Sequence, residues 1–147
     1  PGAVAPVNVY PLLGTPVTDP AAAARPAIVC KIDNHPQARP QTGLNKTDMV
    51  FEENVEALTR FAAVFQSQGS DPVGPLRSGR TQDIDMLGSL NKPMFCWSGG
   101  NYRVTKAINA PNVITVPSTN ARINMWSGTG TNRASNYPPA SSASPGF

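Results

Sequence analysis

The sequence predicts an α/β fold with a mixed sheet: an antiparallel hairpin joined to parallel strand-helix-strand units, with short helices packed on the sheet. The first observation is that two runs with β-type alternation follow each other between Thr47 and Ser67, separated by a short connection. The second is that strand-like runs alternate with helix-like spacing from Val73 onward. Right-handed crossovers make strands in such an order parallel.

The composition fits one domain that buries roughly two thirds of its unfolded surface. The chain has 147 residues, 39% of them hydrophobic, and its 16 prolines and 12 glycines indicate many turns. The net charge is +3, but no Lys/Arg run and no aromatic-basic interleaving is present, which argues against nucleic-acid binding. No apolar run reaches the ~18 residues of a membrane span. We expect a soluble chain whose export signal, if it had one, was removed before Pro1.

Three segments follow from the distribution of residue types. Residues 1–25 form a Pro/Ala-rich lead or edge segment, residues 26–117 the α/β domain core, and residues 118–147 an irregular Ser/Thr/Pro-rich tail. Within the core, Ala27 to Ile32 is an apolar run that predicts a buried strand. It ends in a turn at Asp33-Asn34-His35-Pro36, with Asn34 as a cap, and residues 37–46 follow as a polar loop.

The remaining elements come from spacing. Thr47 to Glu53 and Thr59 to Ser67 alternate as strands, and the short connection Asn54 to Leu58 predicts an antiparallel hairpin. After it we expect a strand at 73–76, a loop at 77–80, a helix at 81–91, a strand at 92–97, a helix near 102–108 and a strand at 112–116.

The two cysteines lie in the middle of apolar runs that lead toward the same edge of the sheet. Cys30 and Cys96 are therefore predicted on neighbouring strands. One disulfide in an oxidising compartment and two buried free thiols both stay open, because neither cysteine has a CxxC or metal-type spacing.

Polar loops follow three of the predicted strands, and ligands of open α/β sheets bind beyond the carboxyl ends of parallel strands. Arg77 and Arg80 flank a Ser-Gly turn before a helix, and their forked donors suit a carboxylate, sulfate or phosphate. We expect a pocket between these arginines and a wall of Asp33, Asn34 and Glu52. The predicted ligand-binding residues are Asn34, Arg39, Arg60, Arg77, Ser78, Arg80 and Ser98.

Carboxylates in the same region raise a catalytic alternative. Asp33, Glu52 and Glu56 could supply the acid and base of a glycosidase, which needs two carboxylates about 5 to 10 Å apart. Structural Arg-carboxylate pairs explain the same residues. His35, the only histidine, is interpreted as a turn residue, and no motif indicates a metal or a cofactor.

Several uncommon strings occur together and in order, and they identify a family. They are Ile32-Asp33-Asn34-His35-Pro36, Ala38-Arg39-Pro40-Gln41-Thr42-Gly43-Leu44, Asp48-Met49-Val50-Phe51-Glu52, Leu58-Thr59-Arg60-Phe61 and Val73-Gly74-Pro75-Leu76-Arg77-Ser78-Gly79-Arg80. With Pro11 to Val17 they resemble the YerB-like family of bacterial envelope lipoproteins over residues 11–117. Arg133-Ala134-Ser135-Asn136-Tyr137 departs from that family, which has a histidine there.

The resemblance implies an exported, often lipid-anchored protein of the bacterial cell envelope, with a second domain outside this sequence. It implies membrane contact only through a lipid anchor outside this chain. Two functions are expected. The first is a module that binds an anionic or glycan ligand, a cell-wall polymer or an envelope protein through its arginine rim. The second is a cell-wall glycan hydrolase or transferase with paired carboxylates. The resemblance implies no cofactor.

Overall fold

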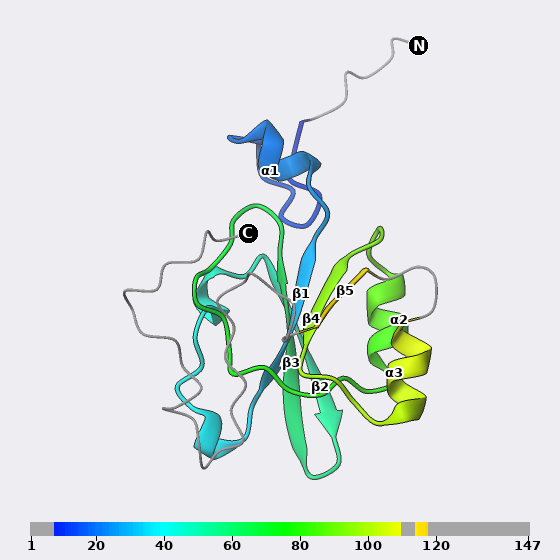
Figure 1. Ribbon diagram of the computed structural model, residues 1–147. Coiled ribbons are helices and arrows are strands. Elements are labelled where there is room, and N and C mark those ends of the chain that lie inside the picture. The colour runs from blue at the N-terminus through cyan, green and yellow to red at the C-terminus, as the bar shows by residue number, and fades with distance from the viewer. Residues whose placement is uncertain (1–7, 110–113, 118–147) are drawn as a thin grey trace.

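A computed structural model describes residues 8–109 and 114–117, and a five-stranded mixed sheet in the order β2-β3-β1-β4-β5 forms its centre (Figure 1). The strands are β1 (Ile28–Asp33), β2 (Met49–Val55), β3 (Leu58–Phe65), β4 (Met94–Trp97) and β5 (Ile114–Pro117). The helices are α1 (Pro20–Ala24), α2 (Asp83–Gly88) and α3 (Tyr102–Ile108), with short 3-10 turns η1 (Pro36–Ala38) and η2 (Leu44–Lys46). The predicted α/β class with a mixed sheet is confirmed.

The hairpin forms as predicted, with a tighter connection than expected. β2 pairs antiparallel with β3 from Met49 opposite Val64 to Val55 opposite Leu58, so only Glu56 and Ala57 make the turn. β3 in turn pairs antiparallel with β1, which places Asp33 opposite Arg60. The hairpin therefore ends beside the carboxyl end of β1.

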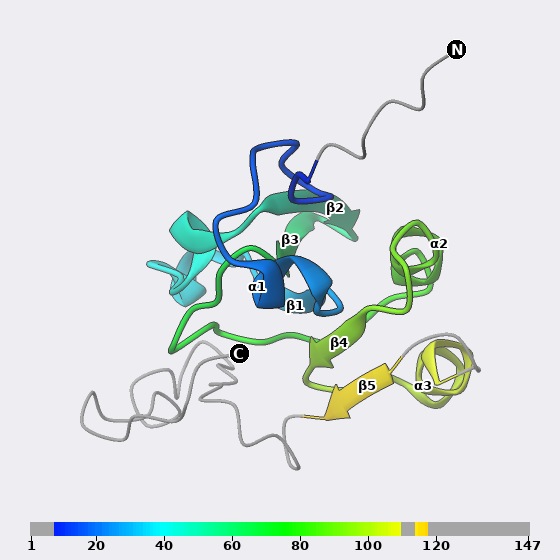
Figure 2. The ribbon, with the colours of Figure 1, turned by 90° about the horizontal axis from the view of Figure 1, so that it is seen from above.

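The other half of the sheet is parallel, because β1 pairs with β4 and β4 with β5. Helices α2 and α3 lie on one face, and the loops around η1 and η2 lie on the other (Figure 2). An apolar cluster fills each face. The helix side includes Val29, Val64, Leu87, Phe95, Trp97, Val104 and Ile108, and the loop side includes Ile28, Cys30, Ile32, Ala63, Phe65, Val73, Leu76 and Cys96.

The predicted parallel strand at residues 73–76 is wrong. This segment makes only isolated antiparallel contacts, Leu76 with Ile32 and Gly74 with Thr42. Pro72 and Pro75 have no N–H to donate to a ladder, so a continuous strand cannot form there. The segment instead crosses the end of β1, where the Asp33 N–H donates to the Pro75 carbonyl at 2.9 Å.

The lead segment folds back on itself through an antiparallel contact between Val9 and Pro16, with Tyr10 buried. It makes no ladder with the five-stranded sheet among the described residues. Asp19 caps α1 by accepting the Ala21 N–H at 3.0 Å. No helix in the described part of the chain is long and apolar enough to cross a bilayer. The predicted tail and the departure at residues 133–137 lie outside the described residues.

Candidate functional site

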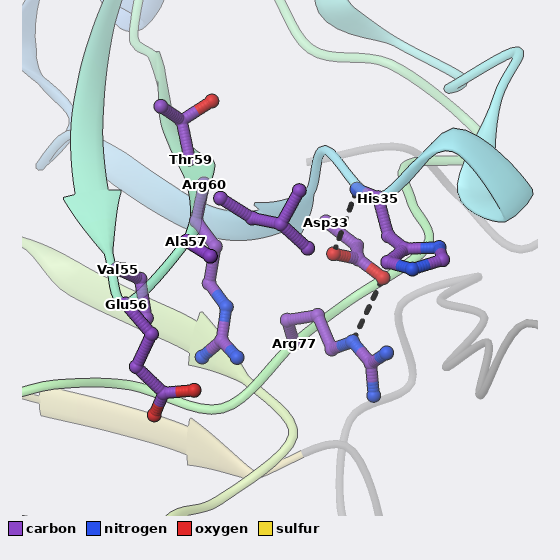
Figure 3. A pocket seen from close by; sticks show the side chains of 9 residues that line it. Asp33, His35, Val55, Glu56, Ala57, Thr59, Arg60 and Arg77 are labelled. Carbon is purple, nitrogen blue, oxygen red and sulfur yellow. Dashed lines mark hydrogen bonds and ion pairs between the residues drawn. The ribbon is translucent and has the colours of Figure 1, made fainter.

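A small pocket of about 160 Å³ lies where the carboxyl end of β1 meets the turn of the β2–β3 hairpin. Its wall consists of charged, polar and a few apolar side chains, namely Asp33, His35, Val55, Glu56, Ala57, Leu58, Thr59, Arg60 and Arg77. Figure 3 shows the guanidinium groups of Arg60 and Arg77 on the same side of this pocket, with the Asp33 carboxylate beside Arg77.

Arg77 is fixed from three directions. Its main-chain N–H donates to the Lys31 carbonyl of β1 at 2.9 Å, and its carbonyl accepts the Ser98 N–H, just after β4, at 3.1 Å. Its Nε donates to Asp33 Oδ2 at 2.8 Å (Figure 3). Asp33 Oδ1 accepts the His35 N–H, so this buried carboxylate orients both the arginine and the turn that follows β1. The two terminal nitrogens of Arg77 make no hydrogen bond within the described residues.

Arg60 and Arg80 complete a group of three guanidinium ions. Arg60 lies on β3 and donates to the Ser78 carbonyl at 2.6 Å, and Arg80 donates to the Gly79 carbonyl at 3.0 Å. Burial lowers the pKa of Arg60, and the positive charges of Arg80 and then Arg77 lower it further, against the opposing effect of Asp33 and Glu56. The positive charges of Arg77 and Arg80 are thus close enough to act on Arg60.

Glu56 is the second acidic group at the pocket. It lies in the hairpin turn with a φ of 58°, a left-handed conformation that non-glycine residues seldom adopt. Its carboxylate is 84% exposed and lies 3.6 Å from Arg80 Nη2. At that distance and exposure the pair contributes little to stability.

The loop that carries the arginines has a tight fit to the sheet. A Cβ built on Gly79 would lie 2.7 Å from Trp97 and 2.8 Å from Ile108, so only glycine fits there. The Gly79 N–H donates to the Gly99 carbonyl at 2.9 Å. The close approach of this loop to β4 and α3 sets the position of Arg77 and Arg80.

A buried ion cluster of Lys31, Glu53 and Asp83 lies next to the same loop. The Lys31 side chain is fully buried on β1, and its Nζ donates to Asp83 Oδ1 at 2.6 Å and to Glu53 Oε2. Asp83 Oδ2 accepts the Arg80 N–H at 2.6 Å, which joins α2 to the end of the arginine loop. Burial raises the pKa of Glu53, while the hydrogen bond from Lys31 lowers it.

The structure brings five of the predicted site residues together at this end of the sheet: Asp33, Glu56, Arg60, Arg77 and Arg80. Ser78 and Ser98 contribute main-chain groups to Arg60 and Arg77, as described above. Asn34 and Arg39 form a separate network, in which Asn34 Oδ1 accepts from Arg39 Nη2 at 3.0 Å. Asn34 also donates to Thr59 at 2.7 Å.

The prediction that Glu52 lines the pocket wall is wrong. Glu52 lies opposite Phe61, which packs on the loop side, whereas its neighbour Glu53 lies opposite Arg60 on the helix side. The Glu52 carboxylate accepts the Thr59 hydroxyl at 2.7 Å and does not line the pocket. Of the proposed acid-base set, Asp33 is held in an ion pair, Glu56 is exposed on the rim and Glu52 is on the other face.

The three residues of the buried ion cluster were missing from the predicted site: Lys31, Glu53 and Asp83. A lysine within the apolar run of residues 27–32 was the available signal, because a buried lysine needs carboxylate partners. His35, expected as a turn residue, caps η1 by accepting the Gln37 N–H on Nδ1, and it also lines the pocket. No group of three His, Cys, Asp or Glu side chains suited to a metal ion occurs among the described residues.

Comparisons with known proteins identify relatives of this chain. A family model described as "Protein of unknown function (DUF3048) N-terminal domain" matches residues 12–138. YerB of Bacillus subtilis (strain 168), provisionally named a lipoprotein, is 48% identical over 71 residues, which are 48% of this chain and 21% of YerB.

A crystal structure of the YerB protein from Bacillus subtilis is similar to the fold, with a TM-score of 0.67 at 33% identity. The similarity covers 74% of this chain and 37% of that chain, so this chain spans well under half of its relative. The predicted YerB-like resemblance is confirmed. The chain belongs to the DUF3048 N-terminal domain family.

Proposed function

We propose that this domain binds an anionic group, a phosphate or a carboxylate, carried by a polymer or protein of the cell envelope. The observation behind the proposal is that Arg60 and Arg77 both line one small pocket. Arg80 lies close enough that its charge, together with that of Arg77, lowers the pKa of the half-buried Arg60. Bringing three like charges together costs free energy unless an anion compensates them.

The charges that face the pocket favour an anion. Arg60 and Arg80 donate to main-chain carbonyls, which leave their charge in place. Of the two carboxylates that line the pocket, Asp33 is paired with Arg77 and Glu56 is 84% exposed. Glu53 and Asp83 are occupied by Lys31, beneath the loop. The planar fork of a guanidinium binds carboxylates and phosphates through two parallel N–H bonds.

The size of the pocket limits what enters it. About 160 Å³ is below the 300 to 1,000 Å³ typical of pockets that enclose a drug-sized ligand. We infer that one charged group enters while the rest of the ligand lies on the surface, which suits a repeating wall polymer or a protein side chain. The provisional lipoprotein name of YerB supports an envelope location.

The hydrolase or transferase alternative stays a prediction. Asp33 and Glu56 both line the pocket, and turnover of wall glycan that is lost in Glu56→Gln would favour this reading. Binding without turnover favours the module.

Titration of the protein with inorganic phosphate, followed by NMR and calorimetry, tests the proposal. We expect resonances of Arg60 and Arg77 to shift, and Arg77→Ala to weaken binding about 10- to 150-fold, the range for a hydrogen bond to a charged group. Added salt should weaken binding further, because the pocket is open to solvent. Arg103→Ala, an exposed arginine on α3, is the control with the same loss of charge.

Equal affinities of Arg77→Ala and Arg103→Ala would refute the site, because the attraction would then come only from net charge. Melting temperatures of both variants must be measured alongside. Arg77→Ala leaves the buried Asp33 without its ion-pair partner, so the affinity has to be compared at a temperature where both variants are folded.

A further inference from the structure

The two cysteines lie directly opposite each other on neighbouring strands. In the parallel pairing of β1 with β4, Cys30 and Cys96 are register partners, and both are fully buried in the apolar cluster of the loop side. Neighbouring strands lie about 4.8 Å apart, within the ~4.4–6.8 Å that Cα atoms of a disulfide span. The prediction of neighbouring strands is confirmed, and the thiols are free in this structure.

Both side chains point to the same face, which a disulfide requires. Cys30 alternates with Val29 and Lys31, which face the helices, and joins Ile28 and Ile32 on the other face. Cys96 belongs to that same cluster. Burial and a hydrogen bond with the Cys96 thiol raise the pKa of Cys30 well above its ordinary value.

We propose that Cys30 and Cys96 form a disulfide when the chain folds outside the cytoplasm. The proposal rests on the extracytoplasmic location contained in the proposed function, because reducing compartments keep such thiols free. The oxidant is a disulfide, either an oxidised dithiol protein or a low-molecular-weight disulfide. One cysteine thiolate attacks it, which releases one sulfur of the oxidant as a thiolate and leaves a mixed disulfide. The second cysteine thiolate then attacks the cysteine sulfur of that mixed disulfide and displaces the other sulfur of the oxidant. The two cysteines lose two electrons and two protons, and the oxidant becomes two thiols.

The bond must form before the sheet closes. In the folded protein both thiols are shielded, and the thiolate that attacks the oxidant is disfavoured at Cys30. Oxidation therefore accompanies folding, and the folded, reduced protein reacts slowly.

The disulfide would join the two strands that hold Arg77. The Arg77 N–H donates to the carbonyl of Lys31, the residue after Cys30, and the Arg77 carbonyl accepts from Ser98, two residues after Cys96. A covalent link between β1 and β4 so close to both anchors would limit their separation during local opening. It also closes a long loop of the unfolded chain, which is the main source of disulfide stabilisation.

The test is to refold the full chain from its reduced, denatured state in a glutathione redox buffer. One sample is then blocked with N-ethylmaleimide in denaturant directly, and a second sample is reduced before it is blocked. The mass of each sample gives its number of adducts. We expect no adduct on the oxidised chain and two adducts when reduction precedes blocking. Two adducts without prior reduction would overturn the proposal.

Melting temperature provides a second readout that needs no variant. The refolded chain should melt on the order of 10 °C higher without reductant than with it. The Cys30→Ala/Cys96→Ala double variant should show no such difference, which controls for other effects of the reductant. If the wild type melts at the same temperature with and without reductant, the proposed disulfide is contradicted.

These outcomes are separate from those of the phosphate titration. A chain that forms the disulfide and binds no phosphate refutes the anion site alone. A chain that binds phosphate and keeps two thiols after oxidative refolding refutes the disulfide alone.

Discussion

Replacing Lys31 with methionine tests whether the buried ion cluster holds the arginine loop in place. The methionine keeps the length and the apolar stem of the side chain but removes its charge. Asp83, fully buried, and Glu53, whose side chain is 12% exposed, would then face each other without a cation. Removing one partner of a buried ion pair costs about 3 to 5 kcal/mol. That is a large share of the 5 to 15 kcal/mol that stabilises a typical domain.

Urea denaturation gives the free energy of unfolding of this variant and of its controls. Lys46→Met removes an exposed lysine on η2 and should change the stability by about 0.5 kcal/mol or less. The triple variant Lys31→Met/Glu53→Gln/Asp83→Asn removes the two uncompensated carboxylates and should recover much of the loss. If Lys31→Met unfolds within about 1 kcal/mol of the wild type, the cluster does not stabilise the fold as argued.

Two further changes act on the acidic neighbours of the arginines. Burial raises the pKa of Glu53 above its ordinary value of 4.5, so the stability this residue contributes is complete below that pH and is lost as the pH rises through the folded-state value. The free energy of unfolding of the wild type should therefore fall relative to Glu53→Gln as the pH rises from 4.5, and parallel pH curves from urea titrations would contradict this. Glu56→Gly should raise the free energy of unfolding by up to ~1 kcal/mol, because glycine adopts the φ of 58° without strain, and it should also tighten phosphate binding. Glu56→Ala loses the carboxylate but keeps the strained backbone, so it should tighten phosphate binding without the gain in stability, and equal stability of the two variants would refute the strain argument.

The sheet was largely predictable because its signals are local. Polar and apolar residues alternate within residues 47–67 with the period of a half-buried strand. The short connection between the two runs allowed only an antiparallel hairpin. The helix at Tyr102–Ile108 was predicted from the spacing of its apolar residues. The predicted helix at residues 81–91 was confirmed only over Asp83–Gly88, because its ends continue as turns.

The strand at residues 73–76 failed for the opposite reason. Its apolar residues are buried, as a strand would have them, since Val73 and Leu76 are both fully buried. Hydrophobicity reports burial and not the direction of the chain. Pro75 within this segment and Pro72 just before it were the signal against a ladder, and the antiparallel crossing over β1 depends on contacts with Ile32 and Thr42.

The sequence by itself determined the family, the mixed sheet, the neighbouring cysteines and the loop that carries Arg77 and Arg80. These features depend on residue types, their spacing and the order of the elements. Only the tertiary structure decided which of two adjacent carboxylates lies on the face with Lys31, because a shift of one residue along a strand moves a side chain to the other face. Glu53 therefore faces Lys31 and the helices while Glu52 faces away. The burial of Lys31 was likewise decided by Glu53 and Asp83, which are 22 and 52 residues away in the chain, a distance over which no local pattern extends.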